Sequence, residues 1–474
     1  MPRTQHRLQS NWCRFEMAAV DFGDPRLNHR FLKTVGQLAE HPSASINSAC
    51  DVWANAKGAY RMFDNDRILP QEILRAHHDR LVPRIDQEPF VFAIQDTTFL
   101  NYTDHLSTQG LGFIGSKNRR RNAQGLLVHT TLGVGMDGLP LGIVDQQVFA
   151  RSPQKVEQKL ARDLAIEDKE SFKWLKAARQ AQKVLSQTHS EVVHIADREG
   201  DVYEFMSEVI KERGHFLVRA SSDRRLNTDD ESYEWLWKHM KSEPVCAQQV
   251  IEVPKPRGGH SSRVAHLEIR FSKVRISPPK RKKKPRSLEV LAELEVYAVW
   301  INEPHPPPHT QPLEWMLLGD IEVTDARDAI ERMNWYKLRW RIEDYHKVLK
   351  TDCRVETCRL ETIERLERYL AIVGIIAWRI LWLTHINRTQ PDAKATQALQ
   401  DHEWKALYCK IHHTNRSPSH PPTIRQAVRW IAQLGGFLGR KGDKEPGLLT
   451  ICRGWQRLMD IADAYLIFTG ATCG

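Results

Sequence analysis

Two apolar segments that each lead into an aspartate constrain the fold of this chain more than any other feature. The first is PFVFAIQDTT at residues 89–98, which contains Asp96, and the second is EVVHIAD at residues 191–197, which leads to Asp197. Short continuous apolar runs are typical of strands buried in the centre of a sheet. Each segment therefore predicts a core strand that ends where its aspartate meets a loop. An aspartate at a strand end is also a common turn former or helix cap, so a structural role is the alternative for each.

The segments around these runs predict a mixed sheet with helices on its faces. Residues 126–134 and 139–149 are predicted strands joined at Met136-Asp137-Gly138, because Asp-Gly favours a tight hairpin. A helical stretch, the Asp197 strand, a second helix and a strand at residues 215–220 follow. This order of elements is that of ribonuclease-H-like folds. The candidate core positions of the first helical stretch are Leu160, Leu164, Phe172, Leu175 and Val184.

A third acidic residue lies in the charged segment YKLRWRIEDYHKVLK at residues 336–350, which has the spacing Tyr-x2-Arg-x3-Glu-x6-Lys. On one continuous α-helix these residues share an arc of about 80° over roughly 21 Å. That length suits a nucleic-acid backbone better than a small molecule. The alternative is a solvated helix face with i,i+4 ion pairs. The residues of the stripe are Tyr336, Arg339, Glu343, Lys347 and Lys350.

Together, the three acids fit a metal site that cleaves phosphodiesters. Hard cations such as Mg²⁺ take oxygen ligands and must also hold the substrate phosphate, so a single carboxylate is not sufficient. Asp96, Asp197 and Glu343 follow one another along the chain as two strand acids and one helix acid. Their spacing alone supports metal-dependent phosphodiester chemistry and no narrower reaction. The formal net charge of +10 favours a polyanionic partner.

The same motifs resemble a known family. The Tyr-Arg-Glu-Lys spacing, Asp96 within QDTT and Asp197 within DREGD resemble the bacterial cut-and-paste insertion-sequence transposases of the DDE class. In particular, the chain is similar to the insertion-sequence-four group around the transposon-five (Tn-five) transposase. Further segments in matching order are FGDPRLNHRF near the start, GAYRMFDN at Gly58, PLEWMLLGD at Pro312 and AQLGGF at Ala432. The resemblance covers nearly the whole chain.

The resemblance implies an α/β protein with a ribonuclease-H-like catalytic core, a β-strand insertion and helical N- and C-terminal domains. Residues 1–69 would bind the transposon end, residues 70–370 would form the catalytic domain, and residues 371–474 would pair two subunits. The insertion, at about 223–312, contains the strand-like segments VCAQQVIEV, VAHLEIRF and LEVLAELEVYAVW. Its basic run KRKKKPR, at residues 280–286, is predicted to be a phosphate-binding arm. A solvated loop or a nuclear-localisation-like signal is the alternative.

The N-terminal region also has a helix signal of its own. Asp24-Pro25 predicts a helix start, and Phe31, Val35 and Leu38 follow at helical spacing. The resemblance implies that arginines of this region contact the transposon end, with ordinary surface arginines as the alternative. Trp315 would stack on a base flipped out of the duplex, although a tryptophan beside Met-Leu-Leu is, taken alone, a core residue. The DNA-binding residues that the resemblance implies are Tyr336, Arg339, Lys347, Lys350, Arg219, Trp315, Arg26, Arg30 and Arg61.

The activity that the resemblance implies is DNA transposition. A homodimer would bind the inverted-repeat ends of double-stranded DNA, cut them through a hairpin intermediate and join the 3′-OH ends to target DNA. Asp96, Asp197 and Glu343 would hold two Mg²⁺ ions, for which Mn²⁺ can substitute. Two alternatives stay open. One is a catalytically inactive DNA-binding regulator or inhibitor of transposition, and the other is a ribonuclease-H-like endonuclease.

The sequence predicts neither a membrane protein nor a small-molecule enzyme. The start MPRTQHRLQSNW is polar and lacks the apolar core of a signal peptide. The most apolar run, residues 370–383, is shorter than a membrane span and contains Arg379. It is therefore predicted to be a buried core helix. The expected location is the bacterial cytoplasm, in association with the nucleoid.

Overall fold

The computed structural model describes residues 12–115, 123–151, 164–227, 233–253, 262–279 and 291–469. The chain forms two compact units. The first comprises residues 1–87, 97–153 and 341–474, and the second comprises residues 88–96 and 154–340. The boundary falls inside strand β1 (Phe90–Asn101), between Asp96 and Thr97. The basic run at residues 280–286 and Leu160 of the predicted helical stretch lie outside the described residues.

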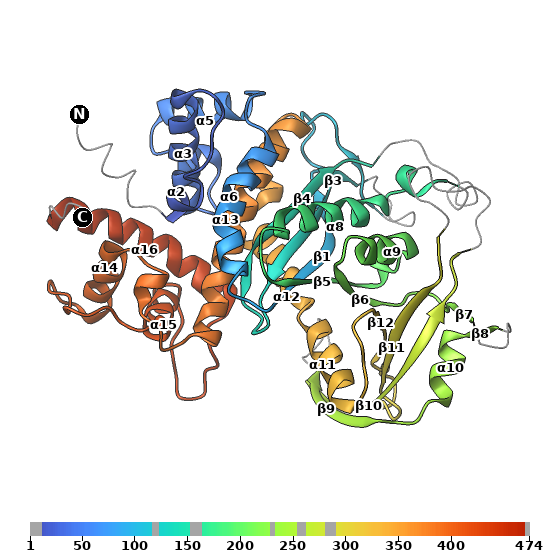
Figure 1. Cartoon of the computed structure of the whole chain (residues 1–474). Coiled ribbons are helices and arrows are strands. Elements are labelled where there is room, and N and C mark those ends of the chain that lie inside the picture. The colour runs from blue at the N-terminus through green and yellow to red at the C-terminus, as the bar shows by residue number, and fades with distance from the viewer. Residues whose placement is uncertain are drawn as a thin grey trace. The chain divides into compact units, whose positions relative to one another are not determined.

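The second unit contains a mixed sheet (Figure 1). Its parallel part is formed by the first half of β1, then β5 (Glu191–Ala196) and β6 (His215–Arg219). β12 (Glu314–Gly319) pairs antiparallel with β6 and continues the sheet into the insertion. The predicted strand-like segments of the insertion are confirmed as three of its strands. The strands of the insertion are β7 (Arg225–Asn227), β8 (Tyr233–Trp235), β9 (Ala247–Val253), β10 (Arg263–Ile276) and β11 (Leu294–Asn302).

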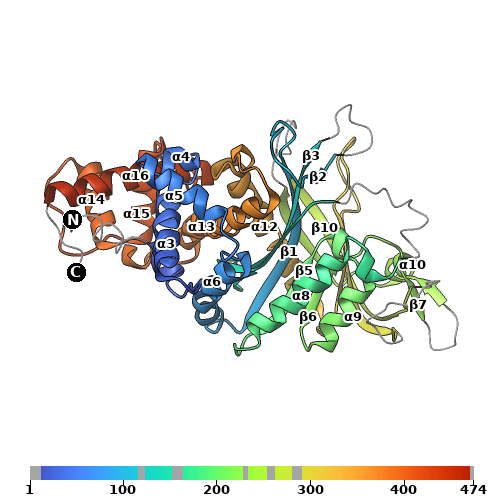
Figure 2. The same ribbon diagram turned by 90° about the horizontal axis from the view of Figure 1, so that it is seen from above.

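Helices pack against this sheet and enclose an aromatic core. Helices α8 (Phe172–Leu185) and α9 (Tyr203–Lys211) lie side by side along β5 and β6 (Figure 2). The short helix α10 (Leu236–Ser242) belongs to the insertion, and α11 (Ala326–Lys337) packs on β10 and β11. The largest side chains that are fully buried in this core are Trp174, Phe205 and Phe216.

The helical stretch predicted before β5 is confirmed in part within the residues that the structure describes. Helix α8 buries Leu175 and Val184 as predicted, and Phe172 packs against the core. Leu164 lies in a bend before the 3₁₀ turn Ile166–Asp168 and not in the helix. Among the described residues, the apolar pattern is thus confirmed as a helix from Phe172 onward.

The first unit is mainly helical and is built around one long helix, α13 (Ile363–Thr389). Among the described residues, α13 has the length and hydropathy of a membrane span, but its most apolar window is 94% buried. It packs against β4 and several helices of the same unit (Figure 1). The core helix predicted for residues 370–383 is therefore confirmed. The other main helices are α2 (Trp12–Glu16), α3 (Pro25–Glu40), α4 (Ile46–Ala49), α5 (Trp53–Phe63), α6 (Pro70–Ile85), α12 (Trp340–Lys347), α14 (Asp401–His412), α15 (Ile424–Leu434) and α16 (Leu448–Thr469).

Two local predictions in the first unit are confirmed. Asp24 caps α3, because its carboxylate accepts a hydrogen bond from the backbone N–H of Arg26, and Pro25 occupies the first turn. The predicted core positions Phe31, Val35 and Leu38 of this helix are buried. The predicted hairpin joins β3 (Gln124–Val134) to β4 (Pro140–Phe149). Gly138 supplies the positive φ of +82° that the turn requires.

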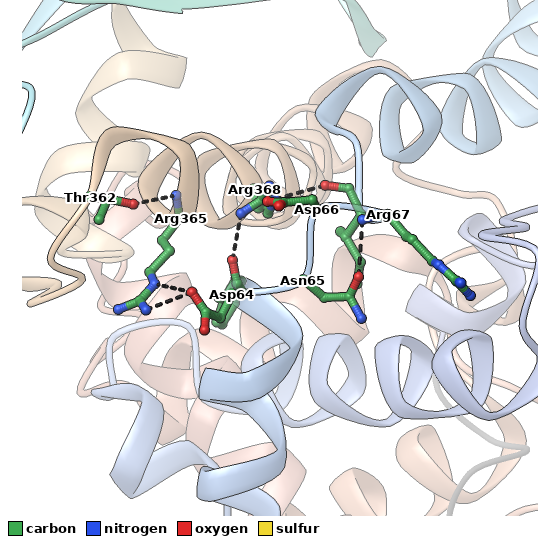
Figure 3. Close-up of polar contacts among 9 residues, drawn as sticks. Asp64, Asn65, Asp66, Arg67, Thr362, Arg365 and Arg368 are labelled. Carbon is green, nitrogen blue, oxygen red and sulfur yellow. Dashed lines mark hydrogen bonds and ion pairs between the residues drawn. The ribbon is translucent and has the colours of Figure 1, made fainter.

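Two arginines of α13 hold the segment that follows α5, and we call this contact the α5–α13 junction (Figure 3). Arg365 donates from Nε and Nη2 to Asp64 Oδ1, at 2.9 and 2.6 Å. Arg368 donates to the carbonyl oxygens of Phe63 and Ile68, at 2.8 and 2.9 Å, and to Asp66 Oδ1 at 2.8 Å. Cations near the last carbonyls of a helix are favourable because they complement its dipole. The junction therefore fixes the C-terminal end of α5 against α13.

Candidate active site

Asp96 and Asp197 lie on adjacent parallel strands at the same level. β1 and β5 pair from Phe90 with Glu191 to Ile94 with Ile195, and the same offset two residues further brings Asp96 level with Asp197. Both residues are partly buried. Asp197 directly follows β5 and caps the 3₁₀ turn η2 (Arg198–Gly200), where its Oδ1 accepts from the N–H of Glu199 at 2.8 Å. The two segments thus bring a pair of carboxylates to one level of the sheet.

The prediction that both aspartates end their strands is confirmed for Asp197 and wrong for Asp96. β1 continues through Thr97 and Thr98 to Asn101. The reason is that β-branched and aromatic residues follow Asp96, and these favour an extended chain. The strand also has a partner there, since β3 pairs with β1 and the side chains of Thr97 and His129 are hydrogen bonded at 2.9 Å. Asp96 is therefore a residue inside a strand.

A buried polar pair braces the two strands just before the aspartates. Gln95 Nε2 lies 3.1 Å from His194 Nδ1, across β1 and β5. Both side chains are fully buried, and burial lowers the pKa of His194 to about 3, so its imidazole is neutral. Sequence reasoning did not single out either residue. Their only signal was a polar side chain inside an apolar strand.

Three residues predicted to grip DNA come together in the second unit. The rings of Trp315 and Tyr336 have centroids 5.5 Å apart and are tilted by 60°. Arg219 donates from Nη2 to the carbonyl oxygen of Glu314 at 2.6 Å, and its charge acts on the Tyr336 phenol. The guanidinium carbon of Arg339 lies 5.9 Å from the Tyr336 ring centroid. Arg219, Trp315 and Tyr336, with Arg339 beside them, are called the aromatic cluster below.

The electrostatics of this cluster involve Asp197. Burial raises the pKa of Tyr336, while the charges of Arg339 and Arg219 act to lower it and that of Asp197 acts to raise it. The phenol is therefore neutral and can donate a hydrogen bond. Burial lowers the pKa of Arg219, although an arginine stays charged at neutral pH. The carboxylate of Asp197, which follows β5, and the guanidinium groups of Arg219 and Arg339 thus all act on the Tyr336 phenol.

The remaining residues of the predicted stripe lie in the first unit, Glu343 and Lys347 on α12 and Lys350 in the turn that follows it. Glu343 and Lys347 are exposed, whereas Lys350 is partly buried and burial lowers its pKa. In the described parts of the chain, no three His, Cys, Asp or Glu side chains form a group arranged to hold a metal ion. The stripe residues therefore divide between the two units, with Tyr336 and Arg339 in the second and Glu343, Lys347 and Lys350 in the first.

The prediction of one continuous helix from Tyr336 to Lys350 is wrong. α11 ends at Lys337, and the amides of Leu338 and Arg339 bond to the carbonyls three residues back, in a tighter turn than an α-helix. α12 begins at Trp340 and is followed by the π-helical turn Val348–Asp352. No proline or glycine marks the break in the sequence. Tyr336 is consequently buried, whereas an ideal helix would have aligned it with the exposed Glu343.

The three arginines predicted to contact the transposon end occupy different environments. Arg26 and Arg61 are exposed. Arg30 is partly buried and lies over Gly58, where an added Cβ would stand 2.7 Å from its guanidinium carbon. Glycine at this position thus lets α3 and α5 approach closely enough to hold the arginine.

Helix α5 also presents residues that sequence reasoning missed. Trp53 is 75% exposed, and Lys57 and Arg61 are exposed at i+4 and i+8 from it. That spacing places all three on one helix face. A tryptophan at the start of a helix gives no sequence signal that separates this surface position from a core position.

Comparison with known families is consistent with this geometry. Residues 9–68 match a family model described as transposase DNA-binding. Residues 175–380 match the transposase DDE domain, and residues 375–467 match the transposase Tn5 dimerisation domain. The DDE match includes Asp197 and Glu343 and begins after Asp96. With DNA-binding, DDE and dimerisation domains in this order along one chain, the protein belongs to the Tn5-like DDE transposases, metal-dependent enzymes that cut and join DNA.

Proposed function

We propose that this transposase moves its element by a cut-and-paste reaction at the inverted-repeat ends of double-stranded DNA. The observation that carries the proposal is the level position of Asp96 and Asp197 on adjacent parallel strands, close to the aromatic cluster. In this reaction water cuts one strand at the element end. The freed 3′-OH attacks the opposite strand and forms a hairpin. A second water opens the hairpin, and the 3′-OH then joins target DNA.

The donor set fits divalent metal ions. Carboxylate oxygens are the ligands that Mg²⁺ and Mn²⁺ prefer, and we assign Asp96, Asp197 and Glu343 to them. Two ions of Mg²⁺, or of Mn²⁺ in its place, would supply activation of the nucleophile and stabilisation of the leaving 3′ oxygen. The exposure of Glu343 supports this assignment, because its carboxylate is accessible to a metal ion that also binds the substrate phosphate.

The aromatic cluster supports a base-flipping role for Trp315. Its indole is partly buried, and Tyr336 meets it at a tilt instead of stacking on its face. Unstacking a base costs a few kcal/mol, and stacking it on an aromatic ring returns about 1–3 kcal/mol. Arg219 would fix the cluster, and the DNA strand next to the flipped base would be held by Tyr336, Arg339, Lys347 and Lys350.

We assign end recognition to residues 1–69. The exposed face of α5 supports this, because it combines Trp53 with the cations Lys57 and Arg61, and phosphate contacts by cations dominate affinity for DNA. Arg26 and Arg30 of α3 would add further contacts. Residues 70–370, with the insertion at about 223–312, would carry the chemistry, and residues 371–474 would pair two subunits into a homodimer. The protein would act on DNA in the bacterial cytoplasm, at the nucleoid.

Cleavage of labelled DNA by the full chain tests this proposal. Duplexes that carry the inverted-repeat ends of the element are incubated with Mg²⁺ and separated on a denaturing gel, and we expect a nicked strand followed by a hairpin-ended flank. Asp96→Ala, Asp197→Ala and Glu343→Ala should abolish cleavage and keep end binding in a gel shift. Glu295→Ala, which removes an exposed acid of the second unit, is the matched control. Normal Mg²⁺-dependent cleavage by any of the three variants would refute the metal assignment.

A second variant tests the base-flipping role. Trp315→Ala should nick the first strand at a normal rate and form hairpins slowly, because its phosphodiester chemistry is intact while the flipped base loses its stacking surface. Both rates are measured in one time course. Equal loss of the two steps would refute the role of Trp315. Nicked products that never become hairpins in the wild-type protein would instead favour a ribonuclease-H-like endonuclease.

A further inference from the structure

The DREGD motif contains a second aspartate, Asp201, whose side chain is wholly buried. Its Oδ1 accepts from Arg224 Nε at 3.0 Å and also from Arg224 Nη2. Its Oδ2 accepts from the backbone N–H and the hydroxyl of Ser221, at 2.7 and 3.0 Å, and from the N–H of Ser222 at 3.3 Å. Both carboxylate oxygens of Asp201 therefore accept hydrogen bonds from the protein. For this reason Asp201, unlike Asp197, is not a candidate metal ligand.

The groups that Asp201 joins lie at the ends of neighbouring strands. Asp201 follows the turn η2, which Asp197 caps after β5. Ser221 and Arg224 follow β6, the strand that ends with Arg219. The Asp201 carboxylate thus links two segments. One follows β5 and Asp197, and the other follows β6 and Arg219.

The contacts continue from this segment to Trp315. Asp223 Oδ1 accepts from the backbone N–H of Trp237 at 3.0 Å, and the indole N–H of Trp237 donates to Glu314 Oε1 at 3.3 Å. Glu314 precedes Trp315, and its carbonyl oxygen accepts from Arg219. The loop that Asp201 holds is thus connected to the aromatic cluster in two ways. It directly follows Arg219 in the chain, and hydrogen bonds through Trp237 link it to Glu314, the residue before Trp315.

We propose that Asp201 is a positioning residue that fixes Trp315 and Arg219 relative to the carboxylate of Asp197. The inference rests on the proposed hairpin reaction and names a residue that controls one of its steps. The first nick needs the metal ligands and water, whereas hairpin formation also needs the flipped base to be held in place. A displacement of about 1 Å between reacting groups can lower a rate by about two orders of magnitude. Loss of the Asp201 contacts should therefore slow hairpin formation far more than nicking.

The test compares Asp201→Asn with a matched control in the full chain. The control is Asp320→Asn, because Asp320 anchors the opposite end of β6 by accepting from the N–H of Phe216 and from His215 Nδ1, both at 2.7 Å. Both variants weaken hydrogen bonds at one end of β6, but only the contacts of Asp201 lie at the end that carries Arg219. We expect Asp201→Asn to lower the hairpin-to-nick ratio by about tenfold or more. Asp320→Asn should leave the ratio unchanged, and both variants should bind ends normally in a gel shift.

A second variant keeps the inference testable if Asp201→Asn does not fold. Arg224→Lys retains the serine contacts and loses the forked donation, so it should lower the same ratio by a smaller factor. An unchanged ratio in both site variants, or an equal fall in Asp320→Asn, would overturn the positioning role while the wild-type protein still forms hairpins. A wild-type protein that forms no hairpin would overturn the proposed function together with this inference.

Discussion

Two contacts in this transposase each join arginine to carboxylate, one at the base of the insertion and one at the α5–α13 junction. These two anchors differ in which partner is buried. At the base of the insertion, Asp201 is 0% exposed and accepts every contact, and Arg224 is 11% exposed. At the α5–α13 junction the buried member is Arg368, at 8%, and the carboxylates of Asp64 and Asp66 are 61% and 96% exposed. One anchor depends on a buried acceptor, and the other depends on a buried donor.

This difference indicates which residue matters in each anchor. A buried charge that loses its partner keeps its desolvation cost, whereas an exposed charge is simply solvated by water. Removal of Asp201, the buried acceptor at the insertion, takes the acceptor away from Arg224 and from the backbone amides of Ser221 and Ser222. Removal of an exposed aspartate at the junction leaves Arg368 with two carbonyl acceptors. We therefore expect the aspartate to be critical at the insertion and the arginine to be critical at the junction.

The largest effect is expected from Asp201→Ala. It removes a partner from a buried ion pair, which typically costs about 3–5 kcal/mol. Hydrogen exchange should show this loss as faster exchange of the amides of Ser221 and Ser222, which donate to Asp201. A loss of local stability below about 1 kcal/mol, the range for exposed pairs, would remove the distinction between the two anchors.

A smaller loss is expected from Arg368→Ala at the junction. Its guanidinium makes three hydrogen bonds, two of them to backbone carbonyls at the end of α5 and beyond. A buried acceptor left without its donor costs about 1–3 kcal/mol, and the two carbonyl oxygens lie close to exposed aspartates where water can enter, so a total loss of about 2–3 kcal/mol is expected. Exchange of the amides at the C-terminal end of α5 measures it. If Asp66→Asn cost as much as Arg368→Ala, the carboxylate and not the arginine would be the critical partner.

The exposed pair of the junction should contribute least among the ion pairs. Arg365→Gln or Asp64→Asn is expected to lower the free energy of unfolding by less than about 1 kcal/mol, because water competes for both groups. The loss should shrink further at high salt, which screens exposed charges. Denaturant unfolding at low and high ionic strength tests this, with Arg368→Ala as the internal reference. A cost that is large and insensitive to salt would contradict the contrast drawn between the anchors.

The smallest effect concerns pH at the opposite end of β6 from Asp201. The hydrogen bond that His215 donates to the Asp320 carboxylate raises the pKa of His215, which is partly exposed. A raised folded-state pKa adds stability at low pH, and that stability is lost as the pH rises through the folded value. The melting temperature should therefore fall slightly between about pH 6 and pH 8, and His215→Gln should flatten that slope. A slope of opposite sign in the wild-type protein would show that His215 is not stabilised as a cation.

Local signals in the sequence predicted much of the fold. Asp24-Pro25 started a helix, Asp137-Gly138 turned a hairpin, and the apolar run before Asp197 became a buried strand, because each depends on neighbouring residues. Asp96 was placed wrongly because the strand continues by pairing with β3, a partner about thirty residues away. Strand propensity is judged from neighbouring residues in the chain, so it does not predict pairing with a distant strand.

The candidate site was predictable in its residues and not in its arrangement. Arg219, Trp315 and Tyr336 were named from the sequence, and the structure brings them together. The break between α11 and α12 has no proline or glycine to mark it, so periodicity extended one helix across it. Asp201 and the Gln95–His194 pair were missed because their meaning lies in contacts between distant segments.

The α5–α13 junction also sets an order of events during synthesis of the protein. Arg368 and its acceptor Ile68 are 300 residues apart in the chain. At about 5–20 residues per second, a ribosome needs on the order of fifteen to sixty seconds to cover that interval. For that time the nascent N-terminal helices exist without α13, while the segments of the second unit, which end at Trp340, have already been made. A fragment that stops before α13 would keep the N-terminal helices in this early state, so end binding should be measured on the full chain.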